Sequence, residues 1–83
     1  MPYINSSVRK DLQEEYQSMN PADAGELNYA ITQIILEYFH ENGERYQQIN
    51  DVLGALEGAK LEFYRRLAAP YEDTKIKENG DVY

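Results

Sequence analysis

Five acidic residues could supply oxygen ligands to a magnesium ion held between two helices. Hard divalent cations prefer carboxylate oxygens, and helical nucleotide hydrolases gather such carboxylates on facing helices. The candidates are Glu26, Glu37, Asp51, Glu57 and Glu62. The spacing does not form an E-x-x-E segment facing an E-x-x-D segment. A magnesium-dependent nucleotide hydrolase is therefore an alternative hypothesis, and we predict no cofactor and no metal site.

Three basic residues and a tyrosine form a second candidate group. Lys60, Arg65 and Arg66 flank Tyr64, and a guanidinium fork can bind a phosphate or carboxylate. The same arginines also complement the dipole at a helix C-terminus. They follow Glu62 by three and four residues, the spacings at which side chains on a helix form ion pairs. We retain the four residues as possible contacts to an anion or a partner.

Gly54 and Gly58 lie four residues apart in a segment that otherwise has helical periodicity. A glycine inside a helix costs about 1 kcal/mol relative to alanine. A common compensation is the close approach of another backbone, and Ala55 and Ala59 leave further room there. These four small residues predict a site where a second helix or a ligand comes close.

Length and charge narrow the classes of function. With 83 residues, no cysteine and one histidine, the chain allows one domain, residues 1–83, and neither a disulfide framework nor a Cys/His zinc site. So short a chain has a marginal core, so we expect a homodimer or higher homo-oligomer. A net charge of −7 argues against nucleic acid or an anionic membrane as partner. An acidic decoy that binds a basic host protein surface is another alternative.

Targeting signals are not recognisable in the sequence. The first residues lack a basic region followed by an apolar run, and no apolar stretch approaches the length of a membrane span. We therefore expect a cytoplasmic protein.

Apolar residues recur at intervals of three and four, which predicts an all-α fold. A first helix is expected from a cap at Ser6 or Ser7 to the Asn20-Pro21 dipeptide. The second is expected to start there, with Asn20 as cap and Pro21 as first helical residue, or at Glu26 if Gly25 delays it. Asn42-Gly43 is a C-terminal stop for that helix.

The third helix is expected to begin within residues 44–48 and to run to Ala68 or Ala69, where Pro70 stops it. Its stripe is close to a heptad, which favours an antiparallel hairpin with the second helix. One or two further turns from Pro70 through Glu78 would end at Asn79-Gly80.

One group of segments is distinctive: Met1–Ile4, Gly25–Thr32, Ile49–Val52, Gly54, Leu56-Glu57, Ala59–Arg66, Ala69–Asp73, Lys75-Ile76 and Glu78–Tyr83. In these segments the sequence resembles a family of small uncharacterised proteins of tailed phages, marine ones included, and of some bacteria. The resemblance covers most of the chain and implies an all-α fold and a phage or bacterial source, with no activity attached. From the Gly54/Gly58 strip, the missing catalytic constellation and the small core we expect a non-enzymatic, homo-oligomeric accessory protein of phage or bacterial origin.

Overall fold

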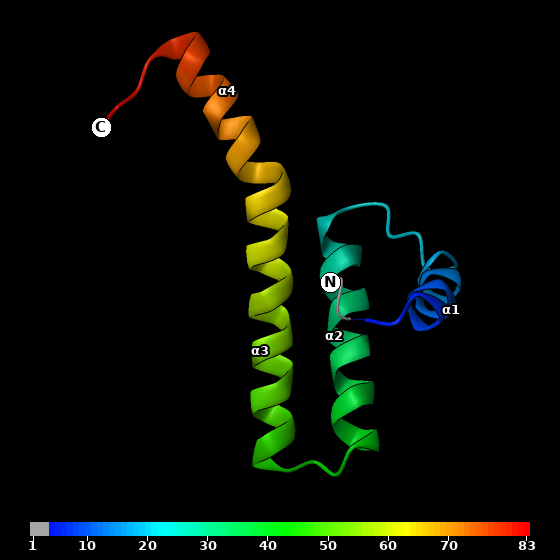
Figure 1. Cartoon of the computed structure of the whole chain (residues 1–83). Helices are drawn as coiled ribbons and strands as arrows, with labels where there is room; N and C mark the ends of the chain where they lie inside the picture. The colour runs from blue at the N-terminus through cyan, green and yellow to red at the C-terminus, as the bar shows by residue number, and fades with distance from the viewer. Residues whose placement is uncertain (1–3) are drawn as a thin grey trace. The chain divides into compact units, whose positions relative to one another are not determined.

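The computed structural model describes residues 4–83, and most of this range is helical (Figure 1). The elements are α1 (Ser6–Tyr16), α2 (Ala24–Glu41), α3 (Tyr46–Phe63), a π-helical segment (Tyr64–Ala68) and α4 (Ala69–Asn79). Residues 4–83 contain no strand, so the predicted all-α class is confirmed. The similarity noted for Met1-Pro2-Tyr3 falls outside the described residues.

The chain divides into two compact units, Met1–Glu37 and Tyr38–Tyr83, with the boundary inside α2. The first unit holds α1 and most of α2. The second holds the last turn of α2, the connecting turn, α3, the π segment and α4. Across that turn the Tyr38 hydroxyl donates to Asp51 Oδ2 at 3.2 Å, so the end of α2 lies beside the start of α3. The predicted helical hairpin is thus closed at its turn.

Asn5, rather than Ser6 or Ser7, caps α1. Its Oδ1 accepts the Ser7 backbone N–H at 2.9 Å and the Ser7 hydroxyl at 2.8 Å. The predicted serine cap is wrong because the asparagine stands one residue earlier and reaches the same orphan N–H group. The helix also ends earlier than expected, at Tyr16, and Gln17–Met19 form a turn.

The second helix begins at Ala24, so Asn20 is not its cap and Pro21 is not its first residue. Asp23 takes the capping role because its Oδ1 accepts the Glu26 N–H at 2.8 Å. The Glu26 carboxylate in turn accepts the Ala22 N–H at 3.3 Å, a reciprocal arrangement close to a capping box. Asn20 instead adopts a left-handed φ of 44°, which suits a turn.

The stop predicted at Asn42-Gly43 is confirmed. Gly43 has a φ of 109°, a region open to glycine, and the Glu44 N–H donates to the Phe39 carbonyl at 3.1 Å. The Asn42 side-chain amide donates to the Tyr38 carbonyl at 2.8 Å. These bonds satisfy carbonyls that the end of α2 would otherwise leave free.

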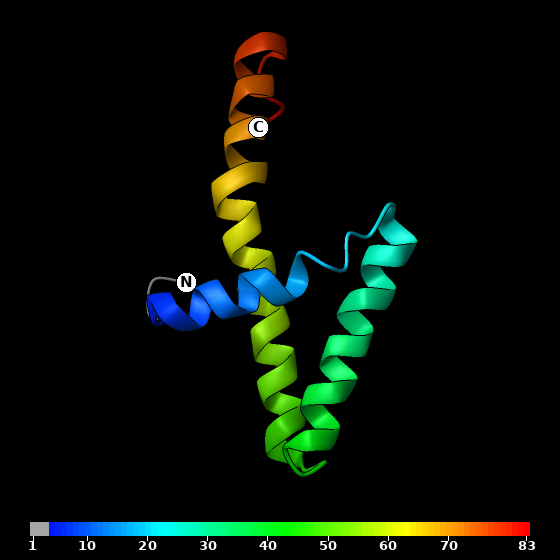
Figure 2. The same cartoon turned by 90° about the vertical axis from the view of Figure 1, so that its right-hand side faces the viewer.

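Pro70 does not stop the third helix, which corrects the prediction. Figure 2 shows α3, the π segment and α4 following one another without a break. A proline inside an α-helix lacks an N–H and clashes with the carbonyl four residues earlier, here that of Arg66. The π turn loosens this region: the Ala69 N–H donates to the Tyr64 carbonyl, five residues back. The helix bends at this point (Figure 1) and runs on to Asn79, where Gly80 closes it as predicted, with a φ of 86°.

Neither unit has a hydrophobic core, because no residue within 4–83 is buried. The most covered positions are half-buried, and several of them, such as Phe39, Gln48 and Val52, lie around the turn between α2 and α3. Large apolar side chains are exposed on every helix. Within the described part of the chain, no helix is long and apolar enough to cross a membrane.

We expect Asn5→Ala to destabilise α1 by about 1 kcal/mol, because the replaced side chain satisfies N–H groups of the first turn. Ser6→Ala is the matched control, since no cap bond comes from Ser6. Amide hydrogen exchange resolved by residue would show faster exchange in α1 for the first variant only. Equal exchange in both variants would contradict the cap.

We expect Pro70→Ala to convert the π turn into regular α-helix, because the new residue supplies the missing N–H and removes the ring. The free energy of unfolding should rise by about 1 kcal/mol or more. Through-hydrogen-bond NMR couplings would then join the Ala69 N–H to the Arg65 carbonyl instead of Tyr64. If the coupling to Tyr64 persists, Pro70 is not the cause of the π turn.

Candidate interaction surface

The face of α3 that carries Gly54 and Gly58 is open. A Cβ atom added at either glycine would meet no atom of the described residues within 4 Å. Residues 4–83 therefore provide no close neighbour at these positions. The prediction that another backbone or a ligand comes close here stays a prediction.

One stripe of residues along α3 begins beside the turn between α2 and α3. Gln48, Val52, Ala55 and Ala59 repeat at intervals of four, three and four, and so share a face. Gln48 and Val52 are half-buried beside the end of α2, and the alanines continue this face along the helix. Gln48 Oε1 is shielded from solvent without a hydrogen-bond partner in residues 4–83.

A second stripe lies about 100° further round the helix, one residue on from the first. We call it the seam, and its eight members are Tyr46, Ile49, Leu53, Leu56, Lys60, Phe63, Leu67 and Tyr71. From Tyr46 to Leu67 they alternate at intervals of three and four, the a/d pattern of a coiled coil. All seven apolar members are exposed, from 39% for Leu56 to 75% for Tyr46. The seam is thus an apolar, heptad-spaced surface that the second unit leaves uncovered.

The π segment keeps the seam continuous past the proline. A regular heptad would place Pro70 seven residues after Phe63. The π turn takes up one extra residue, so Tyr71 follows in that place and carries the seam into α4.

The basic residues proposed as anion contacts do not form one site. Lys60 Nζ lies 3.8 Å from Glu57 Oε1. Arg65 Nη2 and Arg66 Nε donate to Glu62 Oε1 at 3.0 and 2.8 Å. These hydrogen bonds, that of Arg66 foremost, hold the pKa of the Glu62 carboxyl below its usual range.

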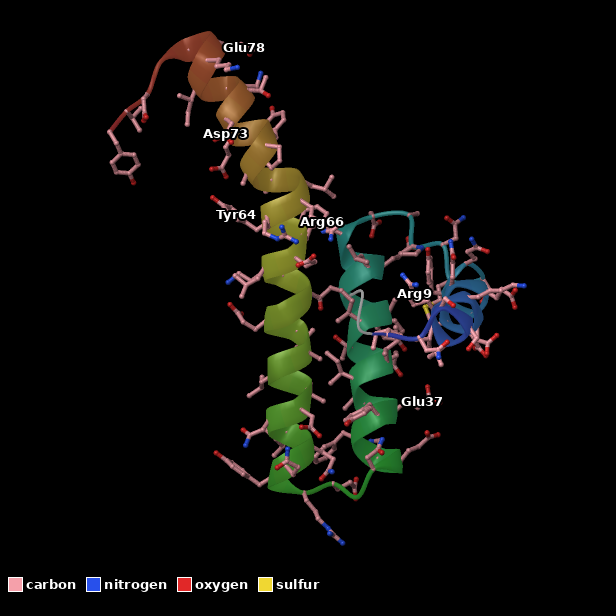
Figure 3. All side chains as sticks on the ribbon, viewed as in Figure 1. Arg9, Glu37, Tyr64, Arg66, Asp73 and Glu78 are labelled. Carbon is pink, nitrogen blue, oxygen red and sulfur yellow. The ribbon has the colours of Figure 1, made fainter. Side chains whose placement is uncertain are left out.

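Tyr64 is turned away from the arginine pair. Tyr64 and Arg66 leave the helix on opposite sides (Figure 3), and the Tyr64 hydroxyl donates to Glu72 Oε2 at 3.3 Å. The negative charge of Glu72 and this bond raise the pKa of the Tyr64 hydroxyl. A contact to a partner anion would have to displace these internal partners.

The acidic candidates for a metal site are likewise engaged separately. Asp51 accepts bonds from Tyr38 and from the Gln47 amide, the latter at 2.8 Å, while Glu57 and Glu62 pair with basic residues of their own helix. Glu26 belongs to the other unit, where it takes part in the cap of α2. Across residues 4–83, no three acidic or histidine side chains are grouped so as to hold a metal ion.

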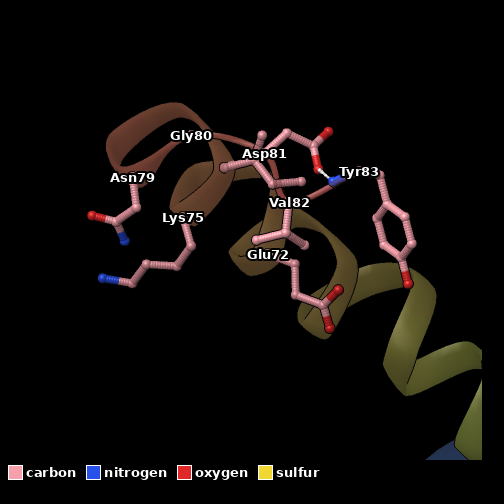
Figure 4. Close-up of a pocket in the computed structure, with 8 residues that line it drawn as sticks. Glu72, Lys75, Asn79, Gly80, Asp81, Val82 and Tyr83 are labelled. Atoms are coloured by element: carbon pink, nitrogen blue, oxygen red, sulfur yellow. Dashed lines mark hydrogen bonds between the residues drawn. The ribbon is translucent and has the colours of Figure 1, made fainter.

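The C-terminal segment borders an open hollow of about 370 Å³. Figure 4 shows Tyr83 on one side of it and Lys75 and Asn79 on the other. Asp81 Oδ1 accepts the Tyr83 N–H at 3.0 Å, while the Val82 and Tyr83 side chains remain almost fully exposed. The hollow is a shallow depression beside a tail whose apolar anchors contact little of their own chain.

Sequence reasoning missed the bond between Tyr38 and Asp51 and the position of Lys60 on the seam. The bond joins two helices across the turn, and spacing along the chain does not reveal such a pair. The alternating intervals could have revealed the seam as far as Leu67, because only Lys60 interrupts its apolar residues. Its continuation to Tyr71 could not have been found in this way, because the π turn changes the spacing there.

The Tyr38–Asp51 bond predicts a pH dependence at the turn. The bond to Asp51 raises the pKa of the Tyr38 hydroxyl, because the carboxylate favours the protonated donor. Its stabilising contribution is therefore complete below the pKa of tyrosine in the unfolded chain, about 10, and is lost as the pH rises through the higher pKa of the folded protein.

Asp51→Ala should lower the Tyr38 titration midpoint and leave that of Tyr64 raised, whereas Glu72→Ala should do the reverse. The pH dependence of the tyrosine ¹³Cζ chemical shifts measures both. If Asp51→Ala leaves the Tyr38 midpoint unchanged, the bond does not persist in solution.

The comparisons with known proteins identify a family but no activity. Residues 1–82 match the family model described as a domain of unknown function (DUF6899). No curated protein and no solved structure matches the chain. Since the match spans nearly the whole sequence, the chain belongs to the DUF6899 family, whose function is unknown.

Proposed function

We propose that this protein is a non-enzymatic interaction protein that works as a homodimer or higher homo-oligomer. The observation that carries the proposal is the lack of any buried side chain in residues 4–83. Ordering a chain costs roughly 1–2 kcal/mol of backbone entropy per residue, and burial of apolar surface is the main term that offsets it. Helices with this much exposed apolar surface gain stability by burying it against another copy.

The length of the third helix supports the same conclusion. From Tyr46 to Asn79 the α3–π–α4 helix is about 50 Å long at 1.5 Å per residue. The 18 residues of α2 extend about 27 Å, and the short turn after Glu41 ties α2 to the start of α3. The α2 helix is therefore only about half as long as the helix from Tyr46 to Asn79, too short to cover it from end to end.

The proposal of binding rather than catalysis is supported by how the charged groups are used. The carboxylates of α3 accept hydrogen bonds or ion pairs from near neighbours, and these pairs are exposed. Exposed pairs within a helix contribute little energy individually, which fits a solvated surface rather than a preorganised reaction centre.

We further propose a phage or bacterial origin and a role as an accessory factor in the cytoplasm of the host cell. This rests on the resemblance of the Ile49–Tyr83 segment to small phage and bacterial proteins. A host protein is a further partner under this proposal, approached by those acidic faces that the homo-oligomer leaves free.

Sedimentation equilibrium of the purified chain, combined with circular dichroism over the same concentrations, tests self-association. We expect a dimer or larger species at micromolar concentration, with helicity falling as dilution releases monomers. A fully helical, cooperatively folded monomer at micromolar concentration would overturn the proposal. A panel of nucleotides with magnesium, assayed on the same sample, should show no turnover, and reproducible turnover would favour a hydrolase.

A further inference from the structure

We propose that the seam of one copy pairs with the seam of a second copy in the antiparallel direction, around a two-fold axis near Gly58. This inference rests on the self-association proposed above and assigns it a surface, a direction and a register. In this register Tyr46 lies opposite Tyr71 of the partner subunit. Ile49 and Leu53 likewise lie opposite Leu67 and Phe63 of the partner subunit.

The first argument is that the seam is complementary to itself when it is reversed. Read from either end, it begins with a tyrosine, continues with aliphatic or aromatic residues and reaches Leu56 and Lys60 at its centre. In an antiparallel coiled coil each a residue faces a d residue, and one register satisfies all eight positions at once. A two-fold axis repeats each pair, as in other isologous interfaces.

Lys60 decides the direction. In a parallel pair the two Lys60 side chains would occupy the same layer, with like charges facing each other. In the antiparallel register Lys60 lies opposite the partner's Leu56, and the partner's Glu57 is the next residue along. Since Lys60 Nζ already lies 3.8 Å from Glu57 Oε1 of its own chain, the axis would bring two lysines and two glutamates together. This cluster is electrically balanced, whereas the parallel layer is not.

The exposed area of the seam is sufficient for a stable dimer. Its seven apolar side chains are on average a little over half exposed, so at about 200 Å² for each side chain they offer roughly 800 Å² per copy. A standard stable interface buries about 800 Å² per partner. The end of α2 lies beside Asp51, which is not a member of the seam, so this contact leaves the seam accessible at the turn.

The π turn has a specific role in this arrangement. By placing Tyr71 instead of Pro70 after Leu67, it gives the seam a second terminal tyrosine to match Tyr46. Two aromatic rings in contact at each end contribute energy beyond their buried area. Gly54, Gly58 and Leu61 lie outside the seam, because at 100° per residue they project from α3 roughly 110–170° away from the centre of the seam.

Disulfide exchange between two single-cysteine variants tests the direction and register. The chain has no cysteine, so L53C and F63C each carry one thiol. Mixed in a glutathione redox buffer, with one variant ¹⁵N-labelled, they should form mainly the mixed L53C–F63C disulfide. L61C, mixed with F63C in the same way, is the control, and it should remain largely reduced or glutathionylated. If each variant instead forms a disulfide mainly with itself, the antiparallel register is wrong.

Charge insertion tests whether the seam is the surface in use. Leu53 and Leu61 are both on α3 and similarly exposed, at 60% and 56%, but only Leu53 belongs to the seam. L53E should weaken dimerisation about 100-fold or more, since each of the two copies loses a buried leucine and would have to bury a charge instead. L61E should change the dissociation constant less than about threefold. Equal effects of the two variants would overturn the proposed surface.

The outcomes separate this inference from the proposed function. A wild-type chain that sediments as a folded monomer would contradict both the proposed self-association and the pairing of the seams. An oligomer that shows no mixed disulfide, or that tolerates L53E, would be consistent with self-association but would contradict the seam as its surface. An L53E chain that loses helicity together with association, while L61E keeps both, supports the seam, because folding then depends on that surface.

Discussion

The rest of this structure depends on one constraint, which is how little apolar surface it buries. Apolar side chains lie along every helix, and no residue within 4–83 is buried. The helices are well formed locally: Asn5 and Asp23 supply caps, Gly43 and Gly80 close C-termini, and Glu62 joins two arginines. None of these interactions removes much apolar area from water. A helix held by caps and exposed ion pairs is marginal in isolation. The helices of residues 4–83 therefore lack the burial of apolar surface that is usually the main stabilising term.

The Pro70 region shows how a local irregularity in the helix affects the exposed apolar surface. A proline in the third helix could have ended it, which would have left α4 as a separate element with its own direction. The π turn lets the helix continue, with a bend, and also changes the phase of the residues beyond it. Tyr71 consequently follows Leu67 on the same face. The π turn thus both relieves the steric clash at Pro70 and keeps the apolar surface continuous.

The charges of the second unit follow a similar logic. They are paired over three or four residues along a helix, as for Glu57 with Lys60 and Lys75 with Glu78, so these charges are balanced on their own helix. The bond from Tyr38 to Asp51 joins two helices across the turn. It holds the end of α2 beside the start of α3, while the apolar residues of the seam remain exposed.

The sequence by itself determined the all-α class, the second and third helices, the stop at Asn42-Gly43 and the closure at Gly80. These depend on periodicity and on the conformational freedom of glycine, both of which are local properties. It did not determine which of several adjacent polar residues caps a helix, so Asn5 and Asp23 were missed in favour of Ser6, Ser7 and Asn20. Only the structure decided that the helix continues through Pro70 by way of the π segment Tyr64–Ala68 just before it, because that outcome depends on how the residues around the proline share their hydrogen bonds. It also decided, through the Tyr38–Asp51 bond, that the end of α2 lies beside the start of α3, since this depends on a contact between residues that are distant in the sequence.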